Sequence, residues 1–215
     1  MNRPGYVGGQ TPFTDRDEYE TLEFFVSQIL NKAAICTLVL VRGVTAGGVG
    51  SPGTVNVQPM VNQVDGLGNA TPHGTIYGIP YFRLQGGGNA VIVEPVVGDI
   101  GVCVFATNDI SSVKANAAPS NPGSARRNSW SDGLYLGGFL NGAPTQYVEF
   151  LAGGGISVVS TGAVNVTAPS VTVTGDLTVT GNLIAEGNVI LGSASGGTPV
   201  RIGSGTALAS KVKAT

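Results

Sequence analysis

The sequence has few charged residues, one histidine and two cysteines. Only 11% of its 215 residues are charged and the formal net charge is −2, so the overall charge does not favour a nucleic-acid partner. Its histidine and cysteine content is too low for a common zinc cluster or a disulfide framework. Cys36 and Cys103 lie in apolar runs, so we expect both to be buried small hydrophobes in a protein made in a reducing cytosol.

Long hydrophobic runs and catalytic motifs are also missing. No segment holds 18 uninterrupted apolar residues, and the N-terminal sequence MNRPGYVGGQ lacks the apolar region of a secretory signal. We therefore expect neither a spanning helix nor a signal peptide. There is no HExxH, P-loop or GxSxG motif. His73, in TPHGT, is interpreted as a turn or core-edge residue, and we expect no catalytic residue, no metal site and no cofactor.

Glycine and small apolar residues are abundant instead. Thirty-four glycines and 42% apolar residues favour an all-β protein over a disordered one. Residues 171–194 read as four six-residue units, VTVTGD, LTVTGN, LIAEGN and VILGSA. Apolar and small polar residues alternate with the period of a strand, and Gly-Asp or Gly-Asn pairs supply turns. This repeat predicts short strands around a β-helix or β-prism.

One chain cannot complete such a prism. A left-handed β-helix uses about three hexads per coil, so four hexads in one chain leave unpaired edges and half a core. Three copies wound together remove both problems, and we predict an intertwined homotrimer. The alternative is a monomeric hexapeptide-repeat acyltransferase, which would need a catalytic histidine near the coils. The residues expected to fill the threefold core are Val171, Val173, Leu177, Val179, Leu183, Val189 and Leu191.

One helix only is predicted, over residues 15–32. Thr14 is the expected N-cap, with Asp17 as its capping-box partner, and further acids suit the positive end of the helix dipole. The apolar face follows the i, i+3, i+4, i+7 spacing. This face packs on its own domain or docks on a neighbouring protein, and its residues are Leu22, Phe25, Val26 and Ile29.

Five strand-like segments between residues 34 and 106 are joined by Gly-rich turns. They are AICTLVLVRGV, TVNVQPMVNQV, TIYGIPYFRLQ, AVIVEP and VGDIGVCVFA. This spacing predicts a small barrel, with an OB-fold favoured over an SH3-like barrel. OB-folds often bind single-stranded nucleic acid, which requires an excess of basic residues. The barrel region has only Arg42 and Arg83 as bases, against the acids Asp65, Glu94, Asp99 and Asp109, so we expect no nucleic-acid site. Arg126 and Arg127 beside Trp130 form either a basic-aromatic patch or, as we favour, part of an ordered loop along the barrel. The predicted divisions are an N-terminal arm and helix (1–32), an OB-fold barrel (33–110), a connector (111–146), a trimeric shaft (147–191) and a tip region (192–215).

Several blocks, taken together and in order, resemble one family. These are VQPMVNQVDGLGNATPHGTIYGIPYFRLQGG, EPVVGDIGVCVFATNDISSVKA, NPGSARRNSWSDGLYLGG and APTQYVEF. They resemble the membrane-puncturing central spike of contractile phage tails and phage-tail-like bacteriocins. The resemblance implies an OB-fold followed by a triple-stranded β-helix, in a trimer at the centre of the virion tail baseplate, assembled in the host cytoplasm.

The resemblance also implies partners. The OB domains would attach to the tail hub, and contraction would drive the shaft mechanically through the bacterial outer membrane. Some family members hold iron at the tip with paired histidines, but this chain has no histidine after His73, so no such ion is expected. A separate tip protein, or apolar packing around Val200, Ile202 and Leu208, would close the spike. The leading hypothesis is a non-enzymatic spike, with the acyltransferase and the nucleic-acid-binding OB protein as alternatives.

Overall fold

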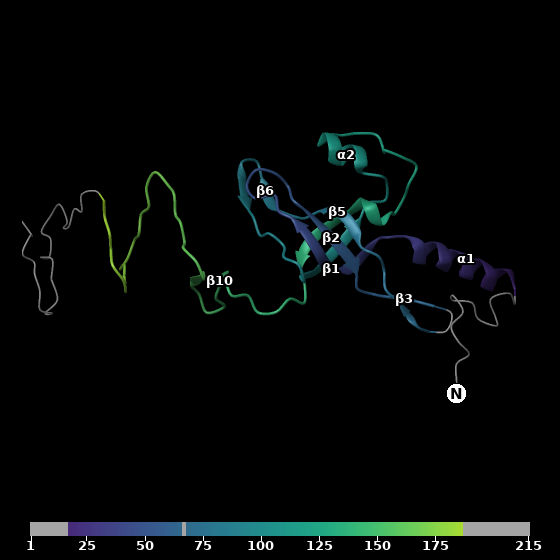
Figure 1. Ribbon diagram of the computed structural model, residues 1–215, viewed down its shortest axis with the longest axis horizontal. Helices are drawn as coiled ribbons and strands as arrows, with labels where there is room; N and C mark the ends of the chain where they lie inside the picture. The colour runs from purple at the N-terminus through teal and green to yellow at the C-terminus, as the bar shows by residue number, and fades with distance from the viewer. Residues whose placement is uncertain (1–16, 66–67, 187–215) are drawn as a thin grey trace, which may run out of the picture. The chain divides into compact units, whose positions relative to one another are not determined.

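The computed structural model describes residues 17–65 and 68–186, and the chain divides into two units after Val159. Strands dominate the first unit and helices are few (Figure 1). A five-stranded antiparallel sheet in the order β5-β2-β1-β8-β9 forms its centre. Its strands are β1 (Cys36–Thr45), β2 (Thr54–Pro59), β5 (Ile76–Pro80), β8 (Ile100–Phe105) and β9 (Gly133–Gly138).

The other elements of the described residues are short strands and helices. Three two-stranded sheets are formed by β3 (Gln63–Val64) with β4 (Ala70–Thr71), β6 (Leu84–Gly86) with β7 (Asn89–Val91), and β10 (Tyr147–Phe150) with β11 (Ile156–Val159). The helical elements are α1 (Glu18–Lys32), α2 (Ser111–Asn116) and the 3-10 turn η1 (Trp130–Asp132).

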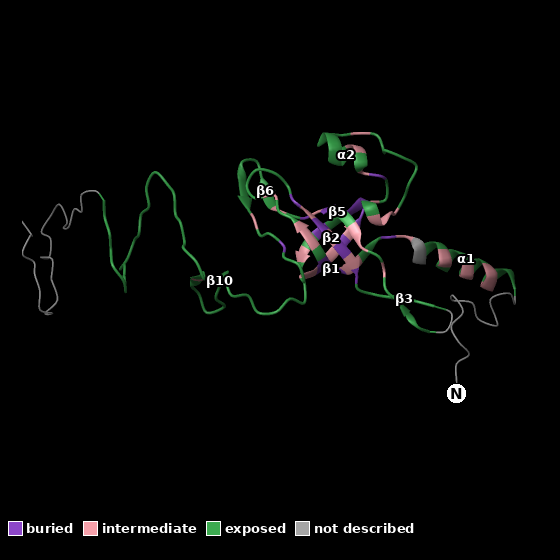
Figure 2. Ribbon diagram, in the orientation of Figure 1, coloured by how far each residue is buried: buried purple, intermediate pink, exposed green. Residues whose placement is uncertain are grey.

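One face of the central sheet carries the core. In β2 and β8 every second residue is buried, which is the period expected when a strand covers a core on one side. Val41 pairs with Val57 across β1 and β2, and both are fully buried. The buried residues gather in this sheet (Figure 2). The apolar core residues are Ala34, Val39, Val41, Val55, Val57, Ile79, Tyr81, Cys103, Phe105 and Tyr135.

The sheet curls into a half-barrel. Register irregularities interrupt β1 near Gly43, β2 between Val55 and Val57, and β8 after Gly101, and each such bulge increases the local twist. The two edge strands approach each other beyond β5, where Tyr81 bridges Tyr135 and the Phe82 amide donates to the Tyr135 carbonyl at 2.7 Å. The prediction of a strand-dominated, all-β protein is therefore confirmed at the level of a curled antiparallel sheet. The assignment of this sheet to an OB-fold stays a prediction.

The fifth strand of the sheet comes from an unexpected place. The segment AVIVEP was expected to supply it, but residues 89–91 pair only with β6, and Pro95 and Gly98, with φ +99°, turn the chain there. β9, inside the range assigned to the connector, pairs with β8 instead. The sheet therefore extends to residue 138, beyond the range 33–110 predicted for the barrel.

Three local predictions need correction. The helix begins at Glu18 with Asp17 as its N-cap, three residues later than Thr14, because the Asp17 carboxylate accepts the Glu20 amide at 2.9 Å. A second helix, α2, lies in the predicted connector. Cys36 is exposed, since it opens β1 before the buried alternation starts, whereas burial raises the pKa of the Cys103 thiol to about 12.

The sheet leaves no room for a side chain at Gly101. A Cβ there would overlap the Gly137 carbonyl oxygen and the Tyr135 ring. We predict that Gly101→Ala lowers the free energy of unfolding by about 1–3 kcal/mol, the usual cost of overpacking a core. Denaturant unfolding followed by fluorescence of Trp130, the only tryptophan, measures this. Gly88→Ala is the control, because that Cβ meets nothing. Equal midpoints for the two variants would contradict the prediction.

Candidate assembly surfaces

The predicted apolar face of α1 is formed and uncovered. The Asp17 cap and the acids Glu18 and Glu20 in the first turn fix where this helix begins. Leu22, Phe25, Val26 and Ile29 are 47–69% exposed. Their common face is therefore a surface on which another protein can dock.

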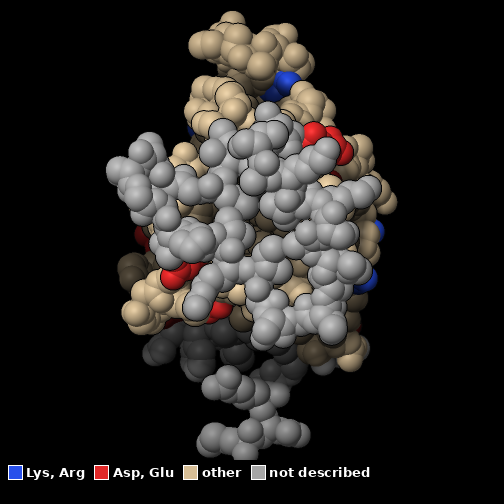
Figure 3. Space-filling view, turned by 90° about the vertical axis from the view of Figure 1, so that its left-hand side faces the viewer, with Lys and Arg blue, Asp and Glu red and all other residues tan. Residues whose placement is uncertain are grey.

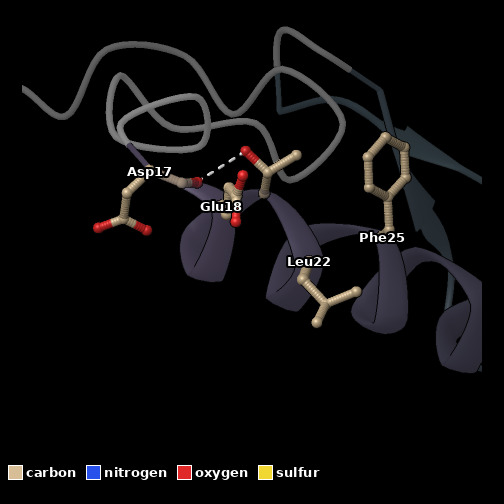
Figure 4. Close-up of a pocket in the computed structure, with 5 residues that line it drawn as sticks. Asp17, Glu18, Leu22 and Phe25 are labelled. Carbon is tan, nitrogen blue, oxygen red and sulfur yellow. Dashed lines mark hydrogen bonds between the residues drawn. The ribbon is translucent and has the colours of Figure 1, made fainter.

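A hollow of about 510 Å³ lies along the first turns of this helix (Figure 4). Leu22 and Phe25 line it together with Asp17, Glu18 and Thr21. The Thr21 hydroxyl donates to the Asp17 carbonyl oxygen at 2.9 Å, so its donor is used within the helix. The hollow offers apolar contact area beside two carboxylates.

The β10–β11 hairpin carries a second uncovered apolar face. Val148 pairs with Val158 and Phe150 with Ile156, and alternation places these four side chains on one side of the two strands. They are 59–76% exposed. An isolated two-stranded hairpin is only marginally stable in water, so packing of this face against another surface would stabilise it.

The repeat residues of the second unit are exposed in the single chain. Residues 160–186 form no helix or strand in this part of the structure. The repeat positions Val171, Val173, Leu177, Val179 and Leu183 are 45–73% exposed, and the single chain does not bring them together into a core. Val189 and Leu191 lie outside the described residues. These observations leave the predicted threefold register untested.

An ionic cluster of two buried carboxylates and one partly exposed arginine ties the connector to the sheet. Asp132 is fully buried and receives two hydrogen bonds from Arg126, at 2.8 and 2.9 Å, and one from the Ile110 amide at 3.1 Å. The Arg126 guanidinium also contacts the Asp109 carboxylate at 2.9 Å. Because Asp132 immediately precedes β9, this cluster fixes where the chain re-enters the sheet.

The electrostatics of Asp109 agree with that geometry. Hydrogen bonds from Ser111 and Ser124, together with the charge of Arg126, hold the pKa of the Asp109 carboxyl well below its ordinary value. The hydrogen bond and charge of Asp132 raise the pKa of Arg126. The sequence analysis did not predict this role for Arg126. The one signal for it was that Asp109 and Asp132 flank an isolated pair of arginines in a segment with few charged residues.

The aromatic cluster accounts for His73 and Trp130. Their ring centroids lie 5.3 Å apart, and the Trp130 ring meets Phe105 edge-on at 4.9 Å. The His73 carbonyl oxygen accepts a hydrogen bond from the Gln58 side chain at 2.7 Å. Trp130 thus packs against the core rather than joining Arg126 in an open binding patch.

Neither a metal-binding cluster nor a membrane-spanning helix occurs in residues 17–65 and 68–186. No group of three His, Cys, Asp or Glu side chains there could hold a metal ion. No helix in this part of the chain is long and apolar enough to cross a bilayer. No protein-family model matches the chain, and no curated protein matches it significantly.

Removing Arg126 tests the cluster. We predict that Arg126→Ala lowers the denaturant midpoint of Trp130 fluorescence, because it leaves the buried Asp132 carboxylate without its cation. Arg127→Ala is the matched control, since only the backbone of Arg127 is seen to bridge another segment. A midpoint for Arg126→Ala no lower than that of the control would show that the cluster adds no stability.

The lowered pKa of Asp109 predicts a pH dependence. A carboxylate with a depressed pKa in the folded protein contributes stability above its unfolded pKa of about 3.9, and loses it as the pH falls toward the folded value. The stability difference between the native protein and Asp109→Asn should therefore be full at about pH 7 and shrink below about pH 4. Denaturant midpoints of the two proteins between about pH 2 and pH 7 measure this stability difference. A difference that does not change with pH would argue against a lowered pKa of Asp109.

Proposed function

We propose that this protein is a non-enzymatic, homotrimeric central spike of a contractile tail baseplate, which pierces the bacterial outer membrane when the tail contracts. The supporting observation is the regular run of exposed apolar residues at hexad spacing in a segment without secondary structure of its own. Full burial of one such side chain contributes about 1.5–3 kcal/mol, so assembly of three copies has a large driving force.

In this proposal the curled sheet is an OB-fold domain, and the shaft is an intertwined β-prism. The β10–β11 hairpin begins the shaft, with its four-residue apolar face turned toward the other copies. Prism strands paired between chains leave no free edge, which suits a part that carries axial load. The role requires rigidity rather than turnover.

The apolar face of α1 is assigned to the tail hub. Leu22, Phe25, Val26 and Ile29 are exposed along one side of a capped helix, the form in which a helix fills a groove of a partner. We place the protein in the virion tail baseplate after assembly in the host cytoplasm. Either a separate tip protein or apolar packing of the chain's own last residues would close the far end of the shaft.

The alternatives have less support. An OB protein for single-stranded nucleic acid needs free cations beside aromatic residues. Arg42 donates to Gln58, however, and Arg83 donates to the carbonyl oxygens of Ser51 and Gly48. Uncharged residues dominate the described atoms visible in Figure 3. A hexapeptide-repeat acyltransferase needs a histidine beside the coils, while His73 is packed against Trp130.

Val179→Asp tests the trimer. The substitution places three carboxylates around one axis without a partner, and the desolvation penalty of several kcal/mol per ion should abolish assembly. Light scattering coupled to size exclusion should give a mass near three times 21.7 kDa for the native protein and a single-chain mass for the variant.

Thr178→Asp is the matched control. It adds the same charge one residue away, on the opposite side of a strand, and should remain trimeric. The native trimer should also resist SDS at room temperature. A native protein of single-chain mass would sink the proposal, and a trimeric Val179→Asp variant would show that the assigned register is wrong.

A further inference from the structure

An apolar groove of about 390 Å³ lies on the first unit, lined by the β6–β7 segment and β9. Tyr135 and Pro95 form buried parts of its wall, whereas five other apolar side chains are 43–76% exposed and are left uncovered by the described residues. They are Phe82, Leu84, Val91, Val93 and Leu136.

The acids of this groove are already engaged. The Glu94 carboxylate accepts the Gly48 amide at 2.7 Å, and the Asp99 carboxylate accepts the Val96 amide at 2.8 Å. Each carboxylate is thus tied to a backbone amide of its own chain, and the exposed side chains beside the two acids are mostly apolar. The groove therefore favours an apolar occupant.

A strained apolar turn follows β9 directly. Leu140 has φ +61°, a left-handed conformation that ordinarily selects glycine or asparagine, and its side chain is 76% exposed. Neighbouring contacts hold the turn in place. The Phe139 amide donates to the Ile100 carbonyl at 2.6 Å, and the Asn141 side chain accepts the Ile100 amide at 2.8 Å. The result is a fixed turn that presents a leucine outward.

We propose that, in the trimer, the Phe139–Leu140 turn of each copy occupies the groove of the next copy. This inference rests on the proposed function. A threefold axis requires heterologous contacts, in which one patch of a copy meets a different patch of its neighbour and the ring closes after three. The chain supplies two such patches, one projecting and one hollow.

The connection to the shaft identifies a second copy as the occupant. Asn141, which lines the groove, precedes the first shaft residue, Tyr147, by six residues, and this length of chain spans at most about 20 Å. Winding three shafts on one axis therefore brings the three groove regions close together.

Disulfide trapping tests the contact in the full-length chain. The background is Cys36→Ser, because Cys36 is exposed, while the buried Cys103 is retained. Leu140→Cys is combined with Val93→Cys, and in a second protein with Leu84→Cys. After oxidation and boiling in SDS without reductant, covalent dimers and trimers are expected from at least one pair. Each variant with only one of the introduced cysteines should run as a monomer.

Light scattering of the same samples before denaturation separates the two proposals. A trimer in which neither pair yields covalent oligomers overturns this contact and leaves the spike assignment intact. Disulfides formed only within one copy overturn it in the same way. A chain that is monomeric before denaturation overturns the proposed trimer, and this contact with it.

Discussion

The apolar surface that one chain cannot cover is the constraint on which the structure depends. The described residues bury a core only where the sheet curls, and residues 139–186, which follow β9, are almost all exposed (Figure 2). The curled sheet buries its own core, because the inner faces of its strands pack together through residues such as Val41, Val57 and Cys103. The hairpin and the hexads have the same apolar alternation without a second layer. Exposed apolar surface of this kind marks a site of interaction with another surface, which is why we propose assembly with further copies.

The segment between β8 and the β10–β11 hairpin completes the sheet before the chain continues to the exposed hairpin. A strand drawn from residues 133–138 closes one edge of the sheet, and the ion pairs of Asp132 and Asp109 with Arg126 fix the approach to that strand. Burying an unpaired Asp132 would be costly, so the cluster strongly favours one path of the chain. The cluster therefore sets where the chain enters β9.

Local patterns predicted the central strands and the helix, and they failed where distant residues decide. The alternation of β1, β2 and β8 is visible in the sequence because each covers the core on one face. Thr14 and Asp17 are both good N-caps, and only the folded backbone selects Asp17. Similarly, GLYLGG replaces AVIVEP in the sheet because Gly133 permits close contact with Phe105 and Ile79. The partners of Arg126 could not be found from spacing, since they follow from the path of the connector.

The segment between Gly138 and Tyr147 is the point at which axial load would pass from the shaft into the sheet. It contains no regular secondary structure, so by itself it would bend under compression. A left-handed leucine costs about 1–2 kcal/mol. Burying the Leu140 side chain in a neighbouring groove contributes about 1.5–3 kcal/mol. In the proposed trimer this burial would offset the cost of the left-handed leucine, and the same contact would stiffen the joint that the proposed function loads.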